Sequence, residues 1–137
     1  MLSVKLVGGF LPKRSSEFAA GYDLYSNVDI VLTTGPSINI IPIGICVAIP
    51  YGHYGRISPR SSLAIKGIDV GAGVIDQDYR GELRVVIYNL LPNEFKISRG
   101  DRVAQLILEK NSTPDVIVCD ELPTTHRGNG GFGSTGK

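Results

Sequence analysis

Residues 43–49 read IGICVAI, a stretch in which isoleucine or valine occupies every second position. Successive side chains of a β-strand point to opposite faces, so this alternation predicts a strand that buries one face. The stretch LRVVI at residues 83–87 repeats the pattern, with Leu83, Val85 and Ile87 on one side. Both stretches therefore predict sheet structure.

The composition of the whole chain favours the same fold class. Its 137 residues are enough for one domain, and they include 17 glycines and 8 prolines. Glycine and proline form turns, and the apolar content leans on isoleucine and valine, which favour strands. We therefore expect an all-β protein of many short strands joined by tight turns, and not a helical bundle.

Two further stretches are apolar on both faces: VAQLIL at residues 103–108, apart from Gln105, and VIVC at residues 116–119. Strands of this kind need cover on both sides. In a chain this short the cover is either a tight barrel-like core or another subunit. Cys46 and Cys119 lie in apolar segments and are predicted to be two buried, reduced thiols rather than a disulfide or a metal pair.

One short helix is predicted over residues 58–66, SPRSSLAIK. Ser58 would be its N-cap, Pro59 its first helical residue and Gly67 its end. The first free amides, two hydroxyls and a guanidinium would then face outward together and could bind an anion. An ordinary capped helix with solvated serines explains the stretch equally well.

The last ten residues, 128–137, hold five glycines and no aliphatic side chain, which is typical of a disordered terminus. The segment nevertheless contains Phe132 and follows Arg127. A flexible arm that carries an aromatic ring to stack on a base, and side chains that donate hydrogen bonds to phosphate, could close over a nucleotide.

Charge and hydropathy exclude several classes of function. The formal net charge of +1 gives no electrostatic reason to expect nucleic acid or an anionic membrane as partner. No run of 18 apolar residues exists, so no membrane span is predicted, and residues 1–10 lack the features of a signal peptide. His53 and His126 have no metal-ligand spacing, so zinc is not expected.

Five polar, glycine-marked segments are separated by plain strands. They are AGYDL (20–24), GRISPRSSLA (55–64), GVIDQDYRG (73–81), RGDRVAQL (99–106) and RGNGGFGSTGK (127–137). Together they hold groups that can donate hydrogen bonds to phosphate, carboxylates that can serve a metal or act as a general base, and aromatic rings. That inventory suits the hydrolysis of a nucleoside polyphosphate.

These five segments, in this order, resemble the five motifs of the homotrimeric dUTP diphosphatases (dUTPases). The resemblance runs from about Ala19 to the C-terminus. Three positions depart from the family pattern: Ser62 replaces the usual glycine, Ile43 stands where threonine is common, and Arg84 replaces a small or apolar residue.

The resemblance implies a jelly-roll-like, distorted β-barrel with one short helix over residues 1–126. It implies a flexible, glycine-rich arm over residues 127–137 that closes over an active site. It also implies a homotrimer whose three sites each draw on all three subunits. The residues themselves do not specify three-fold symmetry, and a dimer would satisfy the same apolar pattern.

The implied reaction is the cleavage of dUTP to dUMP and pyrophosphate, with Mg²⁺ on the triphosphate, inside the cell in the cytoplasm or the nucleus. Asp76 would hold and deprotonate the attacking water. Asp23 would lie in the outer shell of the Mg²⁺ and contact it through water. Without the resemblance, Asp76 is better explained as an Asx-turn residue beside Asp78 and Gly81.

The resemblance also assigns roles in substrate binding. Tyr79 would lie against the deoxyribose and leave no space for a 2′-hydroxyl, while the backbone of residues 71–74 would read the uracil edge. Phosphates would be bound at the start of the helix and by Gln105, a polar residue that needs a partner in an apolar strand. The implied substrate-binding set is Arg60, Ser61, Ser62, Gly71, Ala72, Gly73, Val74, Tyr79, Gln105, Arg127, Phe132, Gly133, Ser134 and Thr135.

Two alternatives stay open at this point. A deoxycytidine triphosphate deaminase uses a related fold, leaves the triphosphate intact and releases ammonia. A non-catalytic nucleotide-binding protein on the same scaffold would bind dUTP without turnover. The presence of Asp76 counts against the second alternative, because a pure binder has less need of a carboxylate that activates water.

Overall fold

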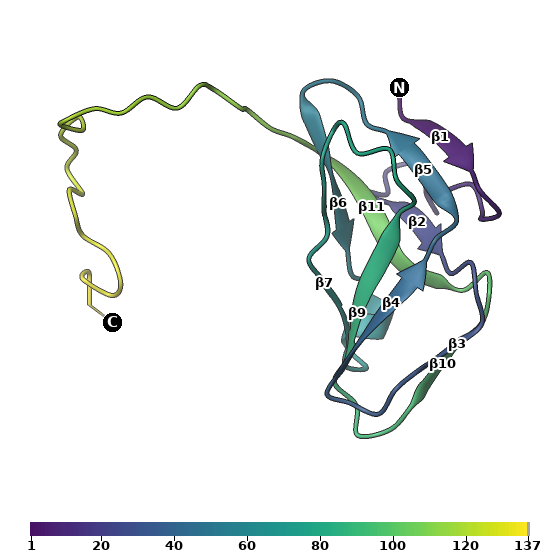
Figure 1. Ribbon diagram of the computed structural model, residues 1–137. Coiled ribbons are helices and arrows are strands. Elements are labelled where there is room, and N and C mark those ends of the chain that lie inside the picture. Colours follow the sequence, from purple (N-terminus) through teal and green to yellow (C-terminus); the bar gives the residue numbers. More distant parts are fainter. Residues whose placement is uncertain (137) are drawn as a thin grey trace.

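The computed structural model describes residues 1–136, so Lys137, the last residue of the predicted arm, lies outside the described residues. The described chain forms short strands and one helix, as Figure 1 shows. The strands are β1 (Ser3–Leu6), β2 (Tyr22–Tyr25), β3 (Ile30–Leu32), β4 (Ser37–Pro42), β5 (Ile45–Ala48), β6 (His53–Ser58), β7 (Ile68–Gly71), β8 (Val74–Ile75), β9 (Arg84–Asn89), β10 (Phe95–Ile97) and β11 (Arg102–Lys110), and the helix is α1 (Ser61–Ala64).

The strand pairs are antiparallel, and three of them are nested. β2 pairs with β11, β3 with β10 and β4 with β9, so that β2 and β11 are the outermost pair of a long folded ribbon. The sheets are β2-β11-β6-β8, β4-β9-β7, β1-β5 and β10-β3. Nested antiparallel pairing is the topology of a jelly roll, so the predicted all-β fold with one short helix is confirmed.

The alternating stretches form the core as predicted. Ile43, Ile45, Val47 and Ile49 are all buried, and Leu83, Val85 and Ile87 lie in the same apolar cluster. Each fully buried side chain of this size stabilises the fold by roughly 1.5–3 kcal/mol relative to an exposed one. The period of two therefore identified the inward faces of two core stretches.

The central strand β11 turns one face to the core, whereas Gln105 and Ile107 on its other face are half-buried, so the predicted cover on both faces is incomplete in the single chain. Val103, Ala104 and Leu106 are buried although two of them are neighbours in the sequence. A register shift between Arg102 and Ala104 in the β2–β11 ladder accounts for this, because an irregularity turns two successive side chains inward.

The predicted apolar strand at residues 116–119 is wrong for the single chain. β11 ends at Lys110, and Val116, Ile117 and Val118 are 96%, 82% and 98% exposed in an extended segment without sheet partners. Figure 1 shows this segment leaving the barrel from the end of β11. The prediction of buried thiols is wrong as well, because Cys119 is exposed and Cys46 is half-buried; both are free.

The helix begins later than predicted. Ser58 is the last residue of β6, and Arg60 occupies the N-cap position without a capping side-chain hydrogen bond. Ser58 is a strand residue because it pairs with Gln105 of β11. Gly67 ends the helical turn as predicted: its φ of +84° is favourable for glycine, and its amide donates to the Ala64 carbonyl.

None of the helices in residues 1–136 combines the length and the apolar content that a membrane crossing requires.

Candidate active site

The first group of candidate residues lies where β2, β11 and β6 run side by side. Gln105 of β11 is opposite Asp23 of β2 on one side and opposite Ser58 of β6 on the other. Its side-chain Nε2 donates to the Pro59 carbonyl at 3.0 Å, so this half-buried amide has a partner within the protein. A Cβ on Gly21 would lie 2.5 Å from the Gln105 Oε1, which explains the glycine before Tyr22.

Two arginines converge on Asp23. The Arg60 Nε lies 3.8 Å from Asp23 Oδ1, and the Arg102 Nη1 lies 3.5 Å from Asp23 Oδ2. Arg60 also donates from Nη1 to the backbone carbonyl of Arg102 at 3.0 Å. The cluster therefore carries two guanidinium groups around one carboxylate and is cationic on balance.

Ser61 and Ser62 follow directly in the first turn of α1 and are exposed. The first hydrogen bonds of the helix are those that Leu63 and Ala64 donate to the Arg60 carbonyl, at 3.0 and 2.9 Å. The amides of Ser61 and Ser62 precede these bonds and are directed out of the helix. The shorter helix thus keeps these outward amides directly after Arg60, and Arg60 and Ser62 line the same hollow.

The second group is the tight connection between β7 and β8. Ala72 and Gly73 have φ values of +52° and +98°, and the Ile57 amide donates to the Gly73 carbonyl at 2.7 Å. A Cβ on Gly73 would lie 2.5 Å from the Ile57 carbonyl oxygen, so glycine is needed for packing against β6. The positive φ of Ala72 has no signal in the sequence.

Asp76 and Tyr79 lie on the loop that follows β8. The Tyr79 amide donates to the Asp76 backbone carbonyl at 3.1 Å, and the Tyr79 hydroxyl donates to the Glu82 carbonyl at 3.0 Å. The ring packs over Gly81, where a Cβ would collide with it. A hollow of about 210 Å³ is lined here by Val74, Ile75, Asp76, Tyr79, Glu82 and Arg84.

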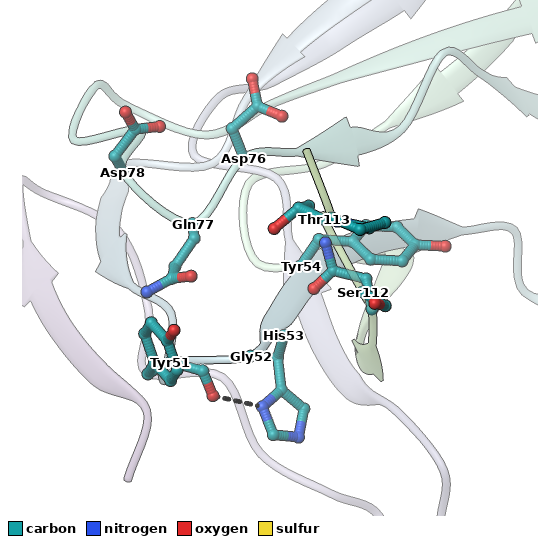
Figure 2. Close-up of a pocket in the computed structure, with 11 residues that line it drawn as sticks. Tyr51, Gly52, His53, Tyr54, Asp76, Gln77, Asp78, Ser112 and Thr113 are labelled. Carbon is teal, nitrogen blue, oxygen red and sulfur yellow. Dashed lines mark hydrogen bonds between the residues drawn. The ribbon is translucent and has the colours of Figure 1, made fainter. Parts of the chain in front are cut away.

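Asp76 also borders a second, larger hollow of about 550 Å³, which sequence reasoning missed. It is also lined by Gln77 and Asp78, by residues 51–54, where the chain turns into β6, and by residues 111–114, where the chain leaves β11. In Figure 2 the carboxylates of Asp76 and Asp78 point away from the Tyr51 and His53 side, whereas Gln77 points towards Tyr51. Asp76 therefore stands on a ridge between two hollows.

The third group lies in the arm, away from the barrel (Figure 1). Arg127 donates from Nε to the Gly130 carbonyl at 2.7 Å, and the Ser134 amide donates to the Gly131 carbonyl at 3.0 Å. Phe132 is fully exposed. A hollow formed by the arm itself is lined by His126, Arg127, Gly130, Ser134 and Thr135.

One chain thus places the candidate residues in three separate groups. Arg60 and Ser62 line a hollow beside β10 and the start of β11, Asp76 and Tyr79 line hollows beside β8, and Arg127, Ser134 and Thr135 line the hollow of the arm. Each of these hollows contains members of one group only. Gly133, with a φ of +88°, lies in the arm with Phe132, whose φ is +50°.

The family model for dUTPase matches residues 9–136 of the chain, which include all three groups. The chain belongs to the dUTPase family. It is 56% identical over 128 residues to the deoxyuridine 5′-triphosphate nucleotidohydrolase of Paramecium bursaria Chlorella virus 1, an alignment that covers 91% of this chain and 89% of the relative.

Solved structures of dUTPases agree with the fold. A mutant dUTPase of Staphylococcus bacteriophage 80alpha, solved with dUpNHpp, superposes with a TM-score of 0.92 at 27% identity and covers 100% of this chain and 99% of that chain. A mutant dUTPase of phage phi11 of S. aureus, whose structure shows the coordination of a structural Mg(II) ion, has a TM-score of 0.83 at 25% identity and covers 88% of this chain and 97% of that chain. This dUTPase therefore has the fold of its family across the barrel and the described arm.

Proposed function

We propose that this dUTPase hydrolyses dUTP to dUMP and pyrophosphate by attack of water on the α-phosphorus. The observation that carries the proposal is that the family match spans the ridge of Asp76, the cationic cluster of Arg60 and the arm of Arg127. This activity would limit the incorporation of uracil into DNA and supply dUMP for thymidylate synthesis. Since its substrate and product are nucleotides of DNA precursor metabolism, the enzyme would act inside the cell, in the cytoplasm or the nucleus.

Asp76 would be the general base. Its carboxylate would accept a proton from the attacking water while the water oxygen bonds to the α-phosphorus. The bond between the α-phosphorus and the bridging oxygen then breaks, and pyrophosphate leaves. The place of Asp76 on a ridge between two hollows supports this role, because a water held there is accessible to a substrate.

The connection from Gly71 to Val74 would recognise uracil through backbone amides and carbonyls. The hydrogen bond from the Ile57 amide to the Gly73 carbonyl supports this role, because it holds the connection in one conformation against β6. Tyr79 would lie against the deoxyribose. Its hydroxyl donates to the Glu82 carbonyl, which holds the ring in place, and a 2′-hydroxyl packed against the face of that ring would lose water without gaining a partner.

Arg60, Ser61, Ser62 and Gln105 would bind the phosphates. Asp23 is the single carboxylate of this cluster, and residues 1–136 contain no group of three side chains of the metal-ligating types. These residues fit a Mg²⁺ that is held by the phosphates themselves, with Asp23 contacting it through water. When bound, the ion would offset the charge of the phosphate oxygens.

The protein would act as a homotrimer that shares its sites. Three observations support this: the candidate residues form three separate groups, the arm extends away from its own barrel, and Val116 to Val118 are apolar and uncovered. In an assembled site, Phe132 would stack on uracil and Arg127 would meet the γ-phosphate of a substrate bound by other subunits. Closure of the arm would exclude bulk solvent from the site while the attacking water stays bound.

The decisive experiment measures pyrophosphate and ammonia release with dUTP, UTP, dTTP and dCTP side by side. We expect pyrophosphate from dUTP only. Ammonia from dCTP, without pyrophosphate from dUTP, would instead identify a deaminase, and tight dUTP binding without either product would identify a non-catalytic binder. Light scattering on the same sample should give three times the mass of one chain; a monomer with full activity would contradict shared sites.

A further inference from the structure

We infer that Arg102 is a positioning residue for the triphosphate: its guanidinium holds and neutralises Asp23 so that Arg60 can face the phosphates. The inference rests on the proposed function, because it deepens the phosphate subsite assigned there. Arg102 is absent from the set of substrate-binding residues that the family motifs imply, and only the contacts within the folded chain single it out.

Each carboxylate oxygen of Asp23 faces a different arginine. Oδ1 faces Arg60 Nε at 3.8 Å and Oδ2 faces Arg102 Nη1 at 3.5 Å, so each guanidinium takes one oxygen. The side chains of Asp23 and Arg60 are only 14% and 22% exposed, whereas that of Arg102 is 48% exposed. The carboxylate and the inner arginine are thus largely removed from water, and Arg102 closes the cluster on the solvent side.

Arg102 acts on Arg60 through its backbone as well. Its carbonyl accepts the hydrogen bond from Arg60 Nη1 at 3.0 Å, which fixes one edge of the guanidinium. This backbone contact is independent of the Arg102 side chain. A substitution at position 102 therefore tests the contact with Asp23 while the carbonyl contact stays available.

Electrostatics explain why the outer arginine is needed. A triphosphate carries several negative charges, and a carboxylate within the same cluster repels it unless a cation offsets the repulsion. With Arg60 alone, the charge of Asp23 would cancel the single guanidinium. With Arg102 in place, one positive charge remains for the substrate, and the weakly screened setting of Asp23 makes that difference significant.

The test compares Arg102→Gln and Arg102→Lys with the wild-type trimer, and it uses steady-state kinetics with dUTP and calorimetric binding of dUpNHpp. We expect Arg102→Gln to raise both the KM for dUTP and the Kd for dUpNHpp about tenfold, with kcat within about threefold of wild type, because it removes uniform binding. Lysine keeps the charge that faces Asp23, so Arg102→Lys should remain within about threefold of wild type. Arg14→Gln, which removes a cation from an exposed loop, should leave both constants unchanged and controls for net charge.

A double-mutant cycle with Asp23→Asn decides whether Arg102 acts through Asp23. In the Asp23→Asn background, Arg102→Gln should change the Kd for dUpNHpp by less than about twofold, because the charge to be offset is gone. An unchanged tenfold effect in that background, or a lysine variant as impaired as the glutamine variant, would overturn the inference and make Arg102 a direct phosphate ligand. A lower melting temperature with unchanged KM and Kd would overturn it in favour of a purely structural role. Failure of the wild type to hydrolyse dUTP would refute the proposed function separately, since the binding measurement needs no turnover.

Discussion

Asp76 lies in an ordinary turn of the loop after β8, and it also lines two hollows of the surface. Its backbone carbonyl closes that turn with Tyr79, as an ordinary loop residue does. A turn residue can be replaced by asparagine at little cost, but a general base cannot. Substitution of Asp76 by asparagine therefore distinguishes a residue that only forms the turn from one that acts as the general base.

Asp76→Asn should lower kcat for dUTP about 100- to 10,000-fold, the range that positioned proton acceptors contribute. The Kd for dUpNHpp should stay within about threefold of wild type, because asparagine keeps the size and the turn. Stopped assays of pyrophosphate release and calorimetry measure the two quantities. Unchanged turnover would remove Asp76 from the chemistry.

Gly73→Ala should destabilise the fold by about 2–4 kcal/mol and raise the KM for dUTP. The left-handed φ costs an L-residue roughly 1–2 kcal/mol, and the added Cβ collides with the Ile57 carbonyl. Gly52→Ala is the matched control, because Gly52 has a φ of +73° and open space around its Cβ position. Equal losses of unfolding free energy in the two variants would refute the importance of close packing at the β7–β8 connection.

The sequence singled out Gln105 because a polar side chain is unusual among the apolar residues of its strand. Gln105 is polar in an apolar strand and was expected to need a partner; the carbonyl of Pro59 supplies one within the chain. The pairing of Arg102 with Asp23 and the positive φ of Ala72 could not be predicted, since both depend on where distant strands meet. The assigned roles of the site residues stay predictions for the experiments above.

At the level of elements, β6 and β11 form a long ladder that ends beside the point where the chain leaves the barrel. Near that end, Tyr54 donates a hydrogen bond to Glu109, and Arg56 Nε lies 4.0 Å from the same carboxylate. The hydrogen bond to Glu109 is the main cause that raises the pKa of Tyr54 above its ordinary value of 10.0. The neutral phenol is thus the form that the folded state prefers.

This preference predicts how stability changes with pH. A raised pKa in the folded state means that the stabilisation is fully present below the unfolded pKa of about 10 and is lost as pH rises through the higher folded value. Tyr54→Phe should therefore lower the melting temperature at pH 8, and the difference from wild type should shrink above pH 10. Thermal denaturation from pH 8 to pH 11 measures it; a difference that is constant across this range would contradict the role of the phenol proton.

Strands with a regular alternation of apolar residues could be predicted from the sequence. Boundaries and burial that depend on contacts with other segments could not. The alternation of residues 43–49 and 83–87 identified buried faces correctly, because burial of one face leaves its mark in every second residue. The helix start was placed too early, since Ser58 and Pro59 suit a helix N-terminus as well as they suit the end of β6. The apolar run at residues 116–119 signals a need for cover, but a sequence pattern does not state which chain supplies it.

For the whole molecule, the arm is expected to serve catalysis and not stability. Removal of residues 128–137 should lower kcat/KM for dUTP at least about 100-fold, since Arg127 would lose its ordered surroundings and Phe132, Ser134 and Thr135 would be absent. The melting temperature should change by less than about 2 °C, because the arm residues up to position 136 bond mainly to one another. Calorimetry of the truncated protein beside the full chain measures the second quantity. A large drop in melting temperature would contradict a lid and indicate a structural arm.

The nested pairing of strands has a consequence for biosynthesis. Tyr22 of β2 pairs with Leu106 of β11. The ribosome therefore synthesises β2 long before it synthesises the strand with which β2 pairs. At synthesis rates of roughly 5–20 residues per second, that interval is on the order of ten seconds. During it, β2 offers an unpaired edge in the crowded surroundings of the ribosome. The barrel therefore closes only after β11 has emerged, and the chain depends on reaching that point before its open edges meet those of a neighbouring nascent chain.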